Sequence, residues 1–172
     1  MRHQKRWTST RLLFASALAA AFSLVSGCNG WATGEKITVQ DENPALAAAF
    51  ARLLEEQGTA KLSDVIASSG VHIGEWDRMF SVLSPISSDS LNDKLGTQGI
   101  QLIGLNTDSD SMTQVFLNGE KVVYAYKDEL PRYGVKKGHA KPDSLVSPKS
   151  HVVKEVGGGE RTAWYLQIEG FS

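Results

Sequence analysis

The chain has 172 residues, enough for one domain with a sizeable core, and its 18 Lys and Arg nearly balance its 19 Asp and Glu. Its single cysteine excludes a disulfide within the chain. A chain without a basic excess is not built for general nucleic-acid binding, so we expect no nucleic-acid partner.

The first 27 residues have the pattern of a targeting peptide. Four cations precede the apolar run of residues 12–25, "LLFASALAAAFSLV", and no acidic residue lies among them. A helix of that run would be about 21 Å long, which is shorter than the roughly 30 Å hydrocarbon core of a bilayer. We therefore expect a cleaved export signal over residues 1–27 and no membrane span.

The motif that follows this run, Val25-Ser26-Gly27-Cys28, resembles the lipobox of bacterial lipoproteins. The resemblance implies that a signal peptidase recognises Val25, Ser26 and Gly27 and cuts before Cys28. It also implies that the Cys28 thiol carries a diacylglycerol with acyl chains such as palmitate. We therefore expect an exported protein whose lipid holds it to the bacterial cell membrane or outer membrane. The alternative is an ordinary secretory signal that a cysteine follows by accident.

Removal of the signal changes the charge of the remaining chain. The signal takes four cations with it, so 18 − 4 = 14 basic residues remain against 19 acidic ones, a net charge of −5. Residues 28–36, "CNGWATGEK", are rich in glycine and small polar residues and are expected to form a flexible tether. Residues 37–172 are expected to form a single soluble domain.

Capping residues and apolar spacing predict three helices in this domain. The first begins at Asn43 and Pro44, after a short strand over residues 36–40, and ends at Gly58. A second short helix is expected within residues 61–70. A third is expected over residues 87–96, where serines precede the segment and a glycine closes it.

Strand patterns dominate the later part of the chain. Residues 71–85 predict a buried strand that contains Trp76 and ends at Pro85, and residues 100–105 predict another. A long loop is expected over residues 127–150, followed by a last hairpin around the three glycines 157–159.

The strongest hairpin signal is Asn118-Gly119 within "SMTQVFLNGEKVVYAY". A type I′ turn with these two residues as its loop would pair Leu117 with Glu120 and Val115 with Val122. Together the elements predict an α+β fold, with N-terminal helices packed on one face of a mostly antiparallel sheet.

The run "EWDRMF", followed by Pro85, the serine-led helix and the Asn-Gly hairpin, resembles small bacterial secreted proteins and lipoproteins of unknown function. More loosely it resembles outer-membrane assembly lipoproteins and β-lactamase-inhibitor-like domains. The chain departs from the pattern at Ile86 and Ser87, where an aromatic residue is usual. By analogy the resemblance implies a binding or envelope role, and these families offer no catalytic residues to transfer.

Few residues in the sequence are candidates for catalysis or metal binding. The histidines that remain after signal removal, His72, His139 and His151, lack the spacing of a zinc site. Residues 106–117 begin like a calcium loop but have Ser111 where glycine is needed and Leu117 where glutamate is needed. We therefore expect no metal, no other cofactor and no catalytic residue.

Two groups of charged residues remain as candidates. Glu75 and Asp77 would form a carboxylate pair for hydrolysis if both faced a cleft, but an Asp77–Arg78 pair that satisfies a strand end is the favoured alternative. Residues 121–154 carry eight cations against three anions, a charge of +5. Within this segment Lys136, Lys137 and Lys141 are candidates for contact with anionic lipids or an envelope polyanion, although a solvated loop is the favoured interpretation.

Three functions follow from these patterns. The leading hypothesis is a non-enzymatic envelope lipoprotein that binds a protein or another envelope component. The second is an inhibitor or immunity lipoprotein against a secreted enzyme, with Tyr124, Tyr126 and Tyr133 as exposed anchors. The third is a hydrolase that uses Glu75 and Asp77.

Overall fold

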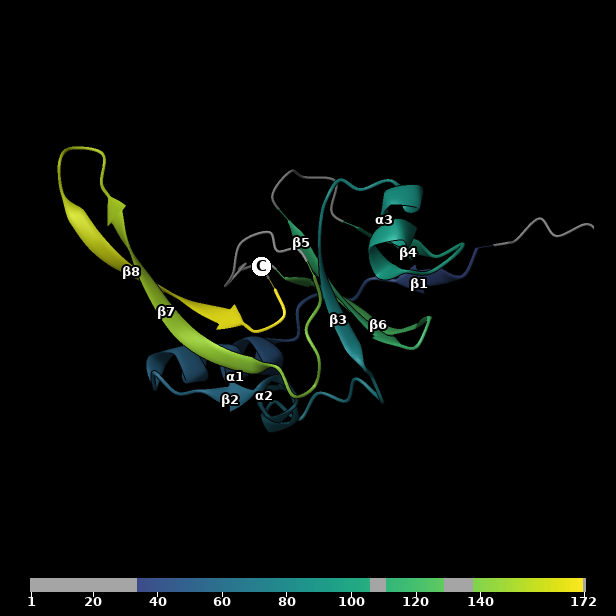
Figure 1. Ribbon diagram of the computed structural model, residues 1–172, viewed down its shortest axis with the longest axis horizontal. Coiled ribbons are helices and arrows are strands. Elements are labelled where there is room, and N and C mark those ends of the chain that lie inside the picture. Colours follow the sequence, from purple (N-terminus) through teal and green to yellow (C-terminus); the bar gives the residue numbers. More distant parts are fainter. Residues whose placement is uncertain (1–33, 106–110, 129–137, 172) are drawn as a thin grey trace, which may run out of the picture. The chain divides into compact units, whose positions relative to one another are not determined.

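The structure is a computed structural model and describes residues 34–105, 111–128 and 138–171. All of these residues belong to one unit of the chain, residues 32–172. No helix among them is long and apolar enough to cross a membrane. The elements in chain order are β1 (Lys36–Thr38), α1 (Pro44–Glu55), β2 (Ala60–Lys61), α2 (Leu62–Ser68), β3 (Arg78–Leu83), α3 (Ser88–Leu95), β4 (Gln101–Ile103), β5 (Met112–Asn118), β6 (Lys121–Asp128), β7 (Leu145–Lys154) and β8 (Glu160–Ile168) (Figure 1).

All three predicted helices are confirmed, because their end signals are local. Asn43 accepts a hydrogen bond from the amide of Ala45 at 2.9 Å, and Pro44 opens α1. The predicted stop at Gly58 is wrong, since α1 ends at Glu55 and Gln57 takes the left-handed conformation with φ of 51°. The Gln57 side chain holds this end by donating to the carbonyl of Leu54 at 2.7 Å.

The third helix follows its sequence signals at both ends. The hydroxyl of Ser87 accepts a hydrogen bond from the amide of Ser90 at 3.2 Å. Gly96 closes α3 in the left-handed conformation with φ of 68°, which glycine adopts without steric cost.

The strands in the described residues form three sheets. β1 and β4 pair in parallel, β2, β7 and β8 form an antiparallel sheet in that order, and β3, β5 and β6 form another. Isolated bridges from Gln40 to Tyr126 and from Met79 to Ala140 extend the β3-β5-β6 sheet on both sides. Figure 1 shows α1 and α2 beside the β2-β7-β8 sheet and α3 beside β1 and β4.

The predicted arrangement of helices on one face of a single sheet is wrong. Every residue of β5 from Met112 to Leu117 is buried, because both faces of the central sheet are covered. Phe116 packs in one core cluster with α1, α2, β7 and β8, whereas Val115 and Leu117 pack in a second cluster with α3 and Leu102 of β4. Successive side chains of β5 thus point into two different cores. Strands, rather than helices, make up most of the regular structure.

The predicted register of the central hairpin is also wrong. Asn118 pairs with Lys121 and Leu117 with Val122, so Gly119 and Glu120 form the loop. Gly119 has φ of 60° and Glu120 does not have a positive φ, which is the type II′ pattern. A bulge between Phe116 and Leu117 then shifts the rest of the hairpin by one residue.

Two other predictions need correction. Trp76 lies before β3, and it packs half-buried against Phe116 with ring centroids 5.1 Å apart. The predicted loop over residues 127–150 is too long, since β7 begins at Leu145 and residues 138–140 contribute the bridges to Phe171 and Met79. The last predicted hairpin is confirmed, with Lys154 opposite Glu160.

Candidate functional site

Most of the predicted contact residues lie outside the described part of the chain. These are Val25, Ser26, Gly27 and Cys28 of the lipobox, Lys136 and Lys137 of the basic segment, and Tyr133. Of the lysine candidates only Lys141 is described. It is exposed, and its amide donates to the hydroxyl of Ser144 at 3.0 Å.

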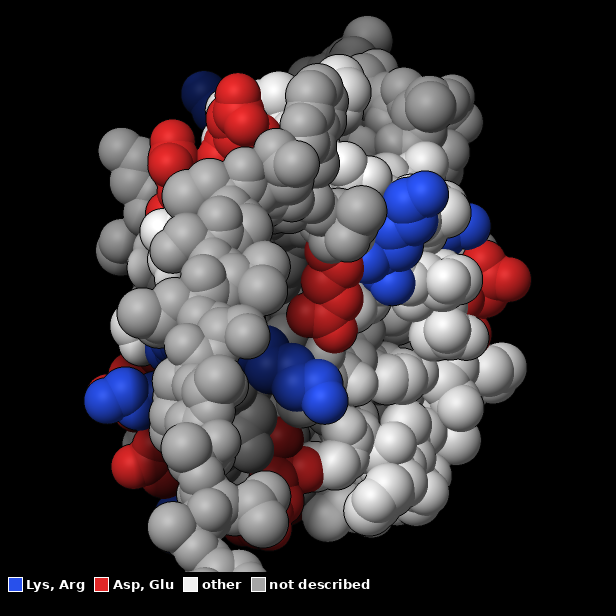
Figure 2. Space-filling view, turned by 90° about the vertical axis from the view of Figure 1, so that its right-hand side faces the viewer, with Lys and Arg blue, Asp and Glu red and all other residues white. Residues whose placement is uncertain are grey.

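The described cations of the basic segment are spread over several elements. Lys121 opens β6, Lys149 and Lys154 lie on β7, and Lys127 is paired with Asp41 at 3.0 Å. On the face shown in Figure 2, described Lys and Arg side chains lie among Asp and Glu side chains rather than in a field of one sign.

Asp77, one member of the predicted carboxylate pair, is committed to the central hairpin. One carboxylate oxygen accepts from the amide of Gly119 at 2.9 Å, and the other lies 3.3 Å from Nε of Arg78. The Arg78 guanidinium also donates to the carbonyl of Gly119. The Gly119 amide, assisted by Arg78, lowers the pKa of Asp77. Both carboxylate oxygens of Asp77 are thus used within the hairpin, and this geometry fits the Asp77–Arg78 alternative.

The lowered pKa makes a pH-dependent contribution to stability. A carboxyl group whose pKa is depressed on folding stabilises the fold above its unfolded pKa, and this contribution is lost as the pH falls through the folded pKa. We therefore expect Asp77→Asn to lower the free energy of unfolding at pH 7, and the difference from wild type to narrow below about pH 4. Urea unfolding at both pH values measures it, with the exposed neighbour Glu75→Gln as control. A difference that is constant with pH would contradict the role of the charge.

The two described tyrosines among the predicted anchors are not exposed. Tyr126 is fully buried and stacks with Phe116 at 6.3 Å between ring centroids, and Tyr124 is half-buried in the same aromatic group. Burial raises the pKa of Tyr124. The aromatic anchors that an inhibitor would need are therefore not these two residues.

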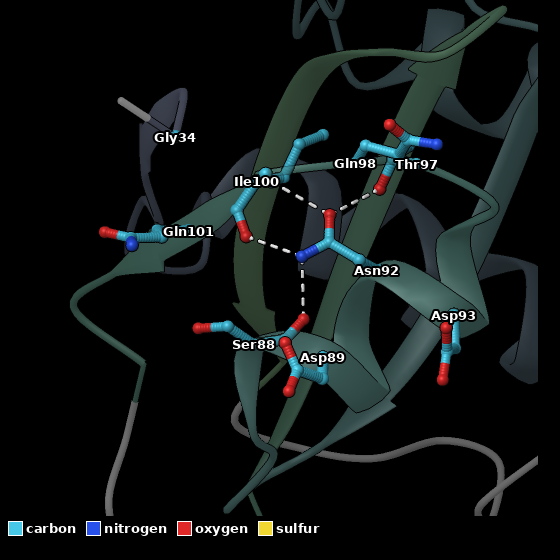
Figure 3. A pocket seen from close by; sticks show the side chains of 10 residues that line it. Gly34, Ser88, Asp89, Asn92, Asp93, Thr97, Gln98, Ile100 and Gln101 are labelled. Atoms are coloured by element: carbon cyan, nitrogen blue, oxygen red, sulfur yellow. Dashed lines mark hydrogen bonds between the residues drawn. The ribbon is translucent and has the colours of Figure 1, made fainter. Parts of the chain in front are cut away.

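A polar hollow of about 430 Å³ lies beside α3 (Figure 3). The side chain of Asn92 forms one wall and is fully used within the protein. Its amide group donates to the carbonyls of Ser88 at 2.7 Å and Ile100 at 3.0 Å, and its oxygen accepts from the Ile100 amide at 2.9 Å and the Thr97 hydroxyl at 3.0 Å. Asn92 thus ties the segment before β4 to α3.

This network gives a stability prediction. Asn92→Ala would remove the side-chain hydrogen bonds to two carbonyls, one amide and one hydroxyl, so we expect a loss of about 2–4 kcal/mol. The neighbouring Asp93 is exposed, and Asp93→Ala should change stability by less than about 0.5 kcal/mol. Chemical denaturation of both variants measures the difference. Equal midpoints would show that the Asn92 bonds do not hold this wall.

Residues 34–105, 111–128 and 138–171 give no support for a metal-binding site. No group of three or more His, Cys, Asp or Glu side chains in these ranges is arranged to hold an ion. His139 instead lies against the ring of Phe80, and His151 against that of Tyr165.

The feature that stands out is the far part of the β7-β8 hairpin, residues 150–164, which we call the distal hairpin. At the base of the hairpin, Val146, Leu166 and Ile168 are buried in the first core cluster. In an antiparallel pair, directly opposite residues point to the same face of the sheet, and so does every second residue along each strand. The same face therefore continues past the core to Val152 and Trp164, which are 62 % and 52 % exposed.

Apolar exposure is concentrated on this element. Five large apolar side chains are exposed in the described part of the chain, and Val152, Val156 and Trp164 of the distal hairpin are three of them. The charges around them cancel. Lys154 lies opposite Glu160 in the register, and Arg161 lies 3.5 Å from Glu155. The distal hairpin is therefore a neutral, partly apolar ribbon on an acidic chain.

The two edges of this hairpin differ at its base, where β7 pairs with β2 and carries Pro148. The Glu169 amide donates to the Leu145 carbonyl, and the Glu155 amide to the Gly159 carbonyl, both at 2.8 Å. Odd-numbered residues therefore bond across the hairpin, and even-numbered residues direct their amides and carbonyls outward. On β7 the outward position 148 is a proline, which has no amide to offer. β8 contains no proline, and no described residue bonds to its outer edge from Glu160 to Trp164.

Sequence reasoning missed Trp164 and Val152 as candidate site residues. Their alternation with polar residues is that of a strand with one buried face, which predicts core packing. Only the length of β7 and β8 relative to the core shows that this face runs out into solvent.

Comparisons with protein-family models, with curated proteins and with solved structures find no match to this chain.

Proposed function

We propose that this chain is a lipid-anchored, non-enzymatic binding protein of the bacterial envelope, and that the distal hairpin contacts its protein partner. The anchor is supported by the Val25–Cys28 motif behind an apolar run of non-spanning length. Trp164 carries the binding part of the proposal, because a core-facing strand surface that continues into solvent is unusual unless something covers it.

The chemistry of the hairpin favours a protein partner. Tryptophan is enriched among the residues that dominate the binding energy of protein interfaces. Four charged residues, Lys154, Glu155, Glu160 and Arg161, surround Val156 at the hairpin tip, and insertion of this tip into lipid would require their desolvation.

A non-enzymatic role is supported because the polar groups best placed for catalysis already form hydrogen bonds within the protein. Asp77 is held by the Gly119 amide and Arg78, and all four hydrogen bonds of the Asn92 amide are made within the protein. Asn92, which lines the polar hollow beside α3, thus stabilises the fold.

Site-specific photo-crosslinking in intact membranes tests the proposal. A photoreactive amino acid replaces Trp164 in one variant and His151 in a second, which is exposed on the opposite face of the same hairpin. We expect a discrete crosslinked protein species from position 164 and much less from position 151. No discrete product from position 164, or equal diffuse labelling from both positions, would contradict the proposed surface.

A further inference from the structure

We propose that the outer edge of β8, from Glu160 to Trp164, pairs antiparallel with the same edge of a second copy of this chain. This goes beyond the proposed function, which concerns the Trp164 face and a different protein. The edge carries the outward amides and carbonyls of Glu160, Thr162 and Trp164, and no described residue uses them. Proline is one device that protects such edges, and on β7 Pro148 removes one outward amide.

The unpaired part of the β8 edge has Thr162 at its middle. Leu166 is fully buried, so the accessible edge ends before it, and the hairpin loop bounds it at Gly159. The middle of residues 160–164 is Thr162, whose amide and carbonyl point outward. A twofold axis there places Thr162 opposite Thr162 and Glu160 opposite Trp164 of the second copy, with every outward amide facing an outward carbonyl.

Charge favours this register and this occupant. Glu160 then faces Trp164 and Arg161 faces Ala163, so no charge lies directly opposite a like charge. The chain without its predicted signal has a net charge of −5, so two copies meet with less repulsion at a neutral element than at an acidic one. The distal hairpin is neutral, because Lys154 and Arg161 balance Glu155 and Glu160.

The pairing joins two hairpins into one four-stranded ribbon. Val152, Thr162 and Trp164 of both copies then lie on one continuous face, which doubles the surface proposed to bind a partner. A five-residue edge covers much less than the about 800 Å² per partner of a stable complex. The pairing is therefore weak in dilute solution and populated where copies are concentrated, as on a membrane.

Thiol crosslinking of the full chain in native membranes tests this pairing. Thr162→Cys places one thiol from each copy at the twofold axis, and Val156→Cys places it at the fully exposed hairpin tip as a matched control. With a short bis-maleimide, we expect about tenfold or more covalent dimer from Thr162→Cys than from Val156→Cys, since pairing fixes a high effective concentration of the two thiols. Dimer from Thr162→Cys no greater than from the control would overturn the inference.

A second measurement checks the register and covers a misfolded Thr162 variant. Co-expressed Glu160→Cys and Trp164→Cys chains should crosslink to each other more than either crosslinks to itself. Absence of this mixed dimer overturns the pairing, whereas efficient self-crosslinking of Trp164→Cys overturns the register centred on Thr162. If these thiols fail to crosslink while a photoreactive group at position 164 still captures another protein, the self-pairing is wrong and the proposed function stands.

Discussion

Replacement of Phe116 by alanine should lower the free energy of unfolding by about 3–5 kcal/mol, a large part of the stability of a domain of this size. Phe116 is 1 % exposed and lies at the centre of an aromatic group. Its ring centroid is 5.1 Å from that of Trp76 and 6.2 Å from that of Tyr124. The truncation would leave a cavity where β5 meets the core formed with α1, α2, β7 and β8.

Denaturant unfolding of the purified protein measures this loss, and two aromatic variants serve as comparisons. Trp76→Ala should cost less than Phe116→Ala, because Trp76 is only half-buried. Trp164→Ala should change stability by less than about 1 kcal/mol, because its side chain is exposed. A Phe116 variant with a midpoint like that of wild type would show that the first core cluster is not the stabilising centre of the fold.

Replacement of Cys28 by serine should abolish formation of the processed, lipid-anchored chain. One acyl chain binds a bilayer with a constant of only about 10⁴ M⁻¹, and stable attachment needs a second chain or another signal. A serine hydroxyl is not a thiolate nucleophile, so we expect the variant to remain unprocessed or to be released. Membrane fractionation together with the mass of the mature chain measures both outcomes.

Ser26→Ala is the matched control for the Cys28 variant. It keeps a small residue before the cleavage site and keeps the thiol, so its processing and membrane attachment should resemble those of wild type. If Cys28→Ser were membrane-bound and had lost its signal to the same extent as this control, the lipoprotein hypothesis would be wrong.

The elements of this fold could be predicted where their signals are local. Asn43 with Pro44, and Ser87 with Gly96, identify helix ends because each residue satisfies or terminates backbone groups near itself in the chain. The glycines 157–159 locate the last hairpin for the same reason.

Arrangements that depend on distant residues could not be predicted in this way. The buried run Val115–Phe116–Leu117 does not show that α3 covers one face while α1 and α2 cover the other. Asp77 and Arg78, about forty residues earlier in the chain, both bind Gly119 and stabilise the turn that forms. A pattern within the hairpin cannot contain that information.

The same limit applies to the candidate site. The sequence predicted Tyr124 and Tyr126 as binding anchors and offered Asp77 as a candidate carboxylate. In the structure the two tyrosines pack against the core and Asp77 hydrogen-bonds within the fold. Trp164 differs from a core tryptophan only in its distance along β8 from Leu166 and Ile168. Its exposure depends on where the body of the protein ends, which is a property of the folded chain.

Hydrogen exchange at single backbone amides most directly tests the claim that the distal hairpin binds another chain along its outer β8 edge. The Arg161 and Ala163 amides bond to β7 and should be protected in every state, whereas the Thr162 and Trp164 amides point outward. We predict that the outward amides exchange fast in the dilute purified protein and slowly in native membranes, where the β8 edge of a second copy pairs with them. Equally fast exchange of the Thr162 and Trp164 amides in both states, with the Arg161 and Ala163 amides protected throughout, would contradict the claim.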